Sequence, residues 1–155
     1  MGAGKTTVAR TLGSKLGWLV EDIDERIEAS EHKTITNIFS QYGEPYFRTI
    51  EREILEKLLP LKHVVVATGG GTFVDPVNRL AINSNGASIW LDISFDEAVA
   101  RLPSNNRRPL AADRTTMQGL YDTRREGYAL AHFRLDADRT PVEELVERIL
   151  HWVEQ

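Results

Sequence analysis

The sequence of 155 residues contains no cysteine. This absence excludes structural disulfides and thiolate metal ligands, although it leaves the redox compartment of the protein open. The four histidines do not stand at the close spacing of a metal site, so we interpret each one as a surface or packing residue. They are His32, His63, His132 and His151.

The sequence also lacks an excess of one charge and any long apolar run. It has 19 basic and 23 acidic residues and a formal net charge of −4, so we expect no nucleic-acid partner and no membrane partner. No stretch approaches the roughly 20 apolar residues of a membrane span, and the first residues do not resemble a signal peptide. We therefore expect a soluble, cytoplasmic monomer. The length and the 41% apolar content predict one domain over residues 1–155.

Four short apolar runs are typical of β-strands, and helical patterns fill most of the chain between them. The runs cover residues 18–21, 64–68, 88–92 and 133–135. Such alternation predicts an α/β fold, a three-layer sandwich with a largely parallel sheet. The run 63–67 has no polar alternation, which favours a central strand covered by helices on both faces.

Local signals predict helix starts and one loop. Thr140 followed by Pro141 is typical of an N-cap with a proline in the first turn, and Ser94 with Glu97 forms a capping box. Residues 103–116 lose the apolar period and collect proline, asparagine and arginine, which indicates a mobile loop over a site.

The sequence opens with a glycine-rich segment that leads directly into a helical pattern, Gly2-Ala3-Gly4-Lys5-Thr6-Thr7. Glycines let backbone amides converge on phosphate oxygens, Lys5 can reach the β- and γ-phosphates, and the Thr6 hydroxyl can bind Mg²⁺. The complete GxxxxGK[ST] pattern requires a further glycine and a strand before residue 1, so the motif is truncated here. A flexible N-terminus without function is the alternative interpretation.

Two acidic residues follow the first apolar run. Asp22 and Asp24 lie at the expected edge of a parallel sheet, where ligands of open α/β folds bind. Residues two apart in an extended chain point the same way, so both carboxylates can face one site. One can hold Mg²⁺ through water while the other orients a hydroxyl or accepts its proton. Alternatively, Asp24 is only the N-cap of a helix over residues 25–30.

Arg124 is an unusual residue on an apolar helix face. Leu120, Arg124 and Tyr128 follow one line at four-residue spacing, which places a guanidinium on a face that otherwise points inward. Such a charge needs a partner, and its planar fork suits a carboxylate of the protein or of a ligand. The residues alone leave both possibilities open.

Three further candidates have ordinary explanations as well. Arg48 can pair on the surface with Glu44 or Glu51 at helical spacing. The glycines at 69–71 allow close approach of a ligand or unusual dihedral angles, but they can also form a simple turn. Arg108 in the expected loop can neutralise a transferred phosphoryl group or can merely be solvated.

Taken in order along the chain, these residues resemble the shikimate kinases, within the nucleoside-monophosphate-kinase-like group of P-loop folds. The resemblance covers essentially the whole chain, and the order and spacing of its segments make it specific. The segments are Gly2-Ala3-Gly4-Lys5-Thr6-Thr7, Asp22-Ile23-Asp24 with Ile27-Glu28, Ile38-Phe39 with Gly43-Glu44, Phe47-Arg48 with Glu51, the glycines 69–71, Arg108-Pro109-Leu110, and Arg124 with Tyr128.

The resemblance implies a parallel sheet in the order 2-3-1-4-5, a substrate-binding segment near residues 24–52 and a lid near residues 103–115. It implies ATP and Mg²⁺ as cofactors and shikimate as the small-molecule substrate. The first strand of such a sheet has no counterpart in these residues, and losing a central strand costs more than the ~5–15 kcal/mol that a domain has to spare. Our hypothesis is that the protein starts upstream, or that this chain folds poorly or is inactive.

The resemblance also implies roles for individual residues. Catalytic roles fall to Lys5, Asp24 and Arg108. Nucleotide contacts fall to Gly2, Ala3, Gly4, Lys5, Thr6, Thr7 and Arg108, with Arg101 and Pro141 bracketing the adenine. Substrate contacts fall to Asp24, Arg48, Gly70, Gly71 and Arg124. Metal contacts fall to Thr6 and Asp22. The alternatives are another small-metabolite kinase of the gluconate kinase type and a noncatalytic nucleotide-binding relic.

Overall fold

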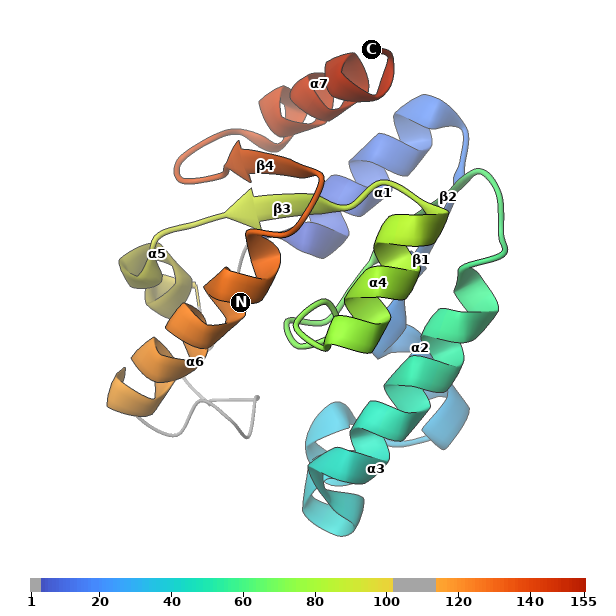
Figure 1. The fold of residues 1–155 in the computed structure, drawn as a ribbon, viewed down its shortest axis with the longest axis vertical. Coiled ribbons are helices and arrows are strands. Elements are labelled where there is room, and N and C mark those ends of the chain that lie inside the picture. The colour runs from blue at the N-terminus through green and yellow to red at the C-terminus, as the bar shows by residue number, and fades with distance from the viewer. Residues whose placement is uncertain (1–3, 102–113) are drawn as a thin grey trace.

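The structure is a computed structural model that describes residues 4–101 and 114–155. Within these ranges helices and strands alternate along the chain (Figure 1). The helices are α1 (Lys5–Leu16), α2 (Ile23–Glu31), α3 (Ile35–Leu58), α4 (Pro76–Asn85), α5 (Phe95–Ala100), α6 (Arg114–Tyr128) and α7 (Val142–Val153). The strands are β1 (Leu19–Asp22), β2 (Val64–Ala67), β3 (Ile89–Asp92) and β4 (Phe133–Asp136). The four apolar runs are therefore strands, as predicted, and no bound differs by more than one residue.

The described strands form two parallel pairs. β1 pairs with β2, with Leu19 opposite Val64, and β3 pairs with β4, with Ile89 opposite Phe133. Parallel pairing confirms the predicted α/β class. Among the strands of the described ranges, β2 and β3 are not joined, so there are two two-stranded sheets. They correspond to the pairs 2-3 and 4-5 of the implied order 2-3-1-4-5, without its first strand.

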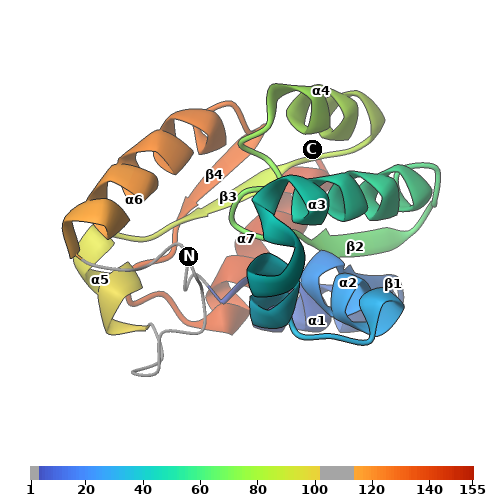
Figure 2. The same ribbon diagram turned by 90° about the horizontal axis from the view of Figure 1, so that it is seen from below.

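Helices cover both faces of the strands. In Figure 2, α4 and α6 lie on one side of the strands and α1 and α7 on the other, which is the predicted three-layer arrangement. β2 takes part in both layers, because Val65 packs with the core around α1 and α7 while Val66 packs with the core around α2 and α3. This alternation of side chains between the two faces confirms that β2 is covered on both sides.

Two of the predicted helix starts need correction. α2 begins at Ile23, and its N-cap is Asp22, whose Oδ1 accepts a hydrogen bond from the Glu25 amide, so Asp24 is not the cap. At α7 the N-cap position is taken by Pro141, without a side-chain cap bond, because the Thr140 hydroxyl donates to the Asp136 and Asp138 carbonyls instead.

The capping box predicted near residue 94 is half present. The Ser94 side chain accepts from the Glu97 amide, as predicted. The Glu97 carboxylate does not return the bond to the Ser94 amide, because it pairs with Arg101 while that amide donates to Asp138. The N-cap itself is therefore confirmed.

α3 is the longest helix of the described ranges. It spans 24 residues and contains a kink at Gly43, where φ is 81° and ψ is 172°, a conformation that favours glycine. The kink lies two residues before Pro45, whose missing amide cannot support a continuous helix. Even so, within residues 4–101 and 114–155 no helix is both long and apolar enough to cross a membrane.

Candidate active site

The predicted phosphate loop lies at the start of α1. Gly4 adopts a left-handed conformation with φ of 75°, and Lys5 is the first helical residue and is half-buried. The Lys5 side chain lines the same cavity as Gly69, so the amino end of α1 faces the loop that follows β2. Gly2 and Ala3 lie outside the described residues, and Thr7 is exposed. The helix dipole places a partial positive charge beside Lys5, which suits an anion.

Asp22 and Thr6 form an oxygen-rich pair beside this loop. The Thr6 hydroxyl donates to Asp22 Oδ2 at 2.7 Å. Hydroxyl and carboxylate oxygens are the donors that Mg²⁺ uses when it binds together with substrate phosphates, so these two residues fit the cation. Within the described ranges there is no cluster of three or more acidic or histidine ligands, and a Mg²⁺ site of this kind does not require one.

The two aspartates are not placed by the extended geometry that the sequence suggested. Asp22 is the last residue of β1, with φ of −118° and ψ of 121°, whereas Asp24 already belongs to the first turn of α2. The rule for residues two apart in a strand therefore does not apply. Asp24 instead lies close to the glycine segment. A Cβ atom added at Gly69 would stand only 2.9 Å from Asp24 Oδ1.

The glycines at 69–71 are needed for close approach rather than for unusual dihedral angles. Gly4, Gly17 and Gly43 are the described glycines with positive φ, so none of the three at 69–71 has it. A Cβ atom at Gly71 would stand 2.6 Å from Arg48 Nη1. The segment also forms turns, since the Thr72 amide donates to the Gly69 carbonyl. A side chain at Gly69 or Gly71 would thus displace Asp24 or Arg48.

Arg48 is held by two carboxylates of its own helix. It pairs with Glu44 at 3.3 Å and with Glu51 at 3.0 Å, the two partners that the sequence offered as an ordinary explanation. The interaction is not a simple surface pair, because the side chain of Glu51 is only 1% exposed. Glu51 also accepts a hydrogen bond from the Thr72 hydroxyl at 2.8 Å. The Arg48 guanidinium is therefore fixed in place while 28% of the side chain remains exposed.

Arg124 lies on the inward face of α6, as its spacing predicted, and is 6% exposed. One turn later on the same face, the Tyr128 hydroxyl donates to the Gly70 carbonyl. This bond joins α6 to the glycine segment that also receives Asp24 and Arg48. The geometry thus brings Asp24 of α2, Arg48 of α3 and Tyr128 of α6 around one short loop, at the carboxyl end of β2.

The remaining predicted residues lie elsewhere or beyond the described ranges. Arg101 is exposed at the end of α5 and pairs with Glu97 at 2.9 Å, and Pro141 is exposed at the start of α7. Arg108 and residues 103–113 of the expected lid fall outside the described residues. The last two positions of that lid, 114 and 115, belong to α6.

Sequence reasoning missed a buried polar network behind Arg48. Thr72 is fully buried, and its carbonyl accepts a hydrogen bond from Asn78 Nδ2 at 3.1 Å. Arg52 donates to Asn78 at 3.3 Å and to Asp75 at 2.6 Å. A threonine directly after three glycines was the available signal, but its partner Glu51 is far away in the sequence.

Asp75 is the titratable group of this network with a clear shift. Burial alone would raise the pKa of its carboxyl, but the hydrogen bonds from the Asn78 and Val77 amides, together with Arg52, lower the pKa below its ordinary value. Asp75 also serves as the N-cap of α4. It therefore fixes the segment that follows the glycines to the start of a helix.

The chain matches one protein family over nearly its whole length. The family model described as shikimate kinase matches residues 1–154. Shikimate kinase from Persephonella marina is 38% identical over 151 residues, which cover 97% of this chain and 92% of the relative. Shikimate kinase from Synechococcus elongatus is 39% identical over 155 residues, covering 97% of this chain and 80% of the relative.

Solved structures show the same similarity in three dimensions. Shikimate kinase from Aquifex aeolicus superimposes with a TM-score of 0.90 at 32% identity, covering 99% of this chain and 92% of that one. Shikimate kinase from Acinetobacter baumannii in complex with shikimate gives a TM-score of 0.91 at 34% identity, covering 99% and 88%. Sequence and fold thus agree on one group of relatives.

Proposed function

Because the chain belongs to the shikimate kinase family, we propose that it transfers the γ-phosphoryl group of ATP to the 3-hydroxyl of shikimate. The products are ADP and shikimate 3-phosphate. The main support for this proposal is that Asp24 and Arg48 both lie close to the glycine segment 69–71. Lys5 lines the same cavity as Gly69 of that segment. Transfer of a phosphoryl group to a hydroxyl of a carboxylic acid requires a lysine for the phosphates, a guanidinium for the carboxylate and an acid for the hydroxyl. All three lie around this loop.

On the nucleotide side, the amides of residues 2–7 and the Lys5 ammonium hold the β- and γ-phosphates. Thr6 and Asp22, whose side chains are hydrogen-bonded to each other, hold Mg²⁺. When bound, the cation neutralises charge on the phosphates. Arg101 and Pro141 bracket the adenine. Thr7 extends the phosphate contact at the first turn of α1, where the helix dipole favours anions.

On the acceptor side, Arg48 and Arg124 bind the carboxylate of shikimate. A guanidinium held by Glu51 is already oriented, so little conformational freedom is lost when the carboxylate arrives. Asp24 accepts a hydrogen bond from the reacting hydroxyl and takes its proton as the oxygen attacks phosphorus. Gly70 and Gly71 present backbone to the substrate at a distance that side chains would prevent.

The transfer itself depends on positioning and on charge neutralisation. The bond from the γ-phosphorus to the bridging oxygen breaks as the new bond to the substrate oxygen forms, and ADP leaves with the bridging oxygen. Arg108 from the lid at 103–115 neutralises charge on the transferred group. Closure of that lid excludes water and prevents hydrolysis of ATP without transfer.

A phosphoryl-transfer assay that couples ADP release to a second enzyme tests the proposal. The chain is incubated with ATP and Mg²⁺ and with shikimate, gluconate or a nucleoside monophosphate in parallel reactions. We expect ADP release above background with shikimate alone, and mass spectrometry should identify shikimate 3-phosphate. Transfer to gluconate would favour the other small-metabolite kinases. Nucleotide binding without transfer to any acceptor would favour the noncatalytic relic, and either result overturns the proposal.

We include in the proposal that the cation is Mg²⁺ and that the enzyme is a cytoplasmic monomer. Removal of divalent cations with EDTA should abolish turnover, and added Mg²⁺ should restore it, because the phosphates need a counter-charge. Analytical ultracentrifugation should give a mass near 17.5 kDa. A species of twice that mass at assay concentration would contradict the monomer.

A further inference from the structure

The hydroxyl of Thr72 is buried against the carboxylate that holds Arg48. Thr72 directly follows the glycine segment 69–71 and is fully buried. Its hydroxyl donates to Glu51 Oε2 at 2.8 Å, and Arg48 Nη1 donates to the same oxygen at 3.1 Å. Because the site is buried, solvent cannot replace a hydroxyl that is removed from it. One oxygen of Glu51 therefore lies between the Thr72 hydroxyl and the guanidinium.

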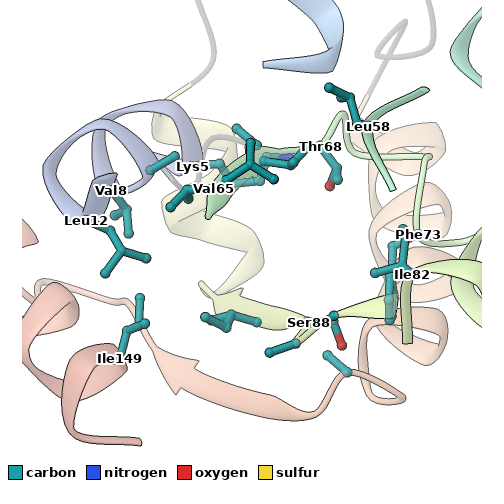
Figure 3. A pocket seen from close by; sticks show the side chains of 18 of the residues that line it. Lys5, Val8, Leu12, Leu58, Val65, Thr68, Phe73, Ile82, Ser88 and Ile149 are labelled. Atoms are coloured by element: carbon teal, nitrogen blue, oxygen red, sulfur yellow. The ribbon is translucent and has the colours of Figure 1, made fainter. Parts of the chain in front are cut away.

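The position of this hydroxyl is fixed by its own backbone and by the next residue. The Thr72 carbonyl accepts a hydrogen bond at 3.1 Å from the side chain of Asn78, which is buried in the first turn of α4. Phe73 lines a cavity, and Figure 3 shows its side chain on the same side of that cavity as Ile82 of α4. The branched side chain of threonine also has few rotamers. The Thr72 hydroxyl is thus a fixed donor to which the Glu51 carboxylate adjusts.

The guanidinium of Arg48 has one firm contact and one weak contact. Nη1 donates to both oxygens of Glu51, at 3.0 Å and 3.1 Å, and the side chain of Glu51 is 1% exposed. Nε and Nη2 both donate to one oxygen of Glu44 at 3.3 Å, and the side chain of Glu44 is 47% exposed. Long bonds to an exposed carboxylate contribute little. An incoming carboxylate can therefore take the Nε–Nη2 edge, while Glu44 turns to solvent.

We propose that Thr72 is a positioning residue for the carboxylate of the substrate, an inference that rests on the proposed function. The Thr72 hydroxyl orients the Glu51 carboxylate, and Glu51 holds Nη1 of Arg48. The Nε–Nη2 edge is thereby presented for bidentate pairing with the substrate. Without the hydroxyl, Glu51 and the guanidinium can turn together as a pair, and a substrate must then restrict that motion when it binds. Because Thr72 is fully buried, it acts through Glu51 and not by contact with the substrate.

The first test removes only the hydroxyl. Thr72→Val has nearly the same shape, and we expect it to raise the KM for shikimate by about 10-fold, since a hydrogen bond to a charged group is lost. The kcat and the KM for ATP should stay within about twofold of the parent, because the carboxylate is bound equally before and during transfer. Thr72→Ser keeps the hydroxyl and should restore the KM. Thr49→Val is the matched control, since Thr49 is exposed beside Arg48 on α3 and donates to the Pro45 carbonyl.

The carboxamide of shikimate separates positioning from a general disturbance of the site. An amide does not pair with a guanidinium as a carboxylate does, so this acceptor gains little from an oriented Arg48. Thr72→Val should lower kcat/KM for shikimate by about 10-fold and that for the carboxamide by less than about twofold. Equal losses on both acceptors overturn the inference, and so does a Thr72→Ser variant as impaired as Thr72→Val. If Thr72→Val does not fold, Thr72→Ala is the variant without a hydroxyl.

The orientation of Arg48 is also measured without any substrate. In protein labelled with ¹⁵N, the Nε–Hε signal of Arg48 is assigned by its absence from Arg48→Lys, and its order parameter reports the motion of the guanidinium. We expect about 0.85 in the parent and in Thr72→Ser, and below about 0.6 in Thr72→Val.

The two readouts distinguish the inference from the proposed function. If shikimate is not phosphorylated but the Arg48 signal follows the Thr72 hydroxyl in this way, the proposed function fails and the positioning of Arg48 by Thr72 stands. A Thr72→Val signal as ordered as that of the parent overturns the inference in either case. Where shikimate is phosphorylated, an unchanged KM for shikimate in Thr72→Val also overturns it and leaves the proposed function intact.

Discussion

β1 and β3 both end in an aspartate, and the two aspartates have different surroundings. Asp22 at the end of β1 is half-buried and accepts hydrogen bonds from the Thr6 hydroxyl and the Glu25 amide. Asp92 at the end of β3 is buried and is bound by Arg125 and by Arg134, whose Nε donates at 2.7 Å.

This difference indicates which carboxylate is available to a ligand. The guanidinium groups of Arg125 and Arg134 neutralise the charge of Asp92. Both also lie over the Trp90 ring, with the guanidinium carbon 4.9 Å from the ring centroid for Arg125 and 5.1 Å for Arg134. The hydrogen bond to Asp92 also raises the pKa of Arg125. Within the described ranges no basic side chain forms an ion pair with Asp22. We therefore expect Asp22 to take part in ligand binding and catalysis, and Asp92 to stabilise the fold.

The variant with the largest expected effect removes the ammonium group of Lys5, the residue before Thr6, which is hydrogen-bonded to Asp22 at the end of β1. Lys5→Ala should lower kcat by about 10²–10³-fold with both substrates saturating, because a preorganised charge on the phosphates is lost. Steady-state kinetics checks this. Lys15→Ala on the same helix is the control, since Lys15 forms an exposed pair with Glu147. Activity that survives Lys5→Ala would contradict the phosphate loop.

Exchanging each aspartate for asparagine tests the comparison directly. Asp22→Asn should lower kcat by about 10²-fold with little change in the free energy of unfolding, because asparagine still caps α2 but has no charge for Mg²⁺. Asp92→Asn should leave kcat of the folded protein unchanged and cost about 1–3 kcal/mol of stability, since Arg125 and Arg134 lose their counter-charge but still reach solvent.

The free energy of unfolding in urea and the kcat are measured on the same preparations of Asp22→Asn and Asp92→Asn. The comparison fails if Asp92→Asn impairs transfer at saturation more than Asp22→Asn does, or if Asp22→Asn is the less stable protein.

Neighbouring arginines on α6 sharpen the comparison further. Arg124→Ala should raise the KM for shikimate by about 10-fold or more while sparing the KM for ATP, because the carboxylate loses one partner. Arg125→Ala should mainly lower stability through Asp92. Measuring both KM values for both variants separates the two effects. An unchanged shikimate KM in Arg124→Ala would remove Arg124 from the site.

Part of this arrangement was predictable from local sequence. Apolar runs located all four strands, and four-residue spacing placed Arg124 on an inward face. The environments of Asp22 and Asp24 were not predictable, because the strand ends where its pairing with β2 ends, and that register depends on a segment 45 residues away. The burial of Glu51 likewise depends on Thr72, which reaches it only after the chain has folded.

The smallest effect concerns Asp75, which lies on neither strand end and fixes the glycine segment to α4. Its pKa is lower in the folded chain than in the unfolded chain, so the carboxylate contributes stability above its unfolded pKa, and this contribution is lost as the pH falls through the folded value. Asp75→Asn keeps an N-cap but should flatten the loss of stability as the pH falls below the ordinary carboxyl value of 3.8. Asp75→Ala should also cost about 1 kcal/mol at neutral pH. Urea midpoints measured at several pH values distinguish the two variants. If Asp75→Asn and the parent lose stability in parallel on acidification, the carboxylate of Asp75 is not the group that links this part of the fold to pH.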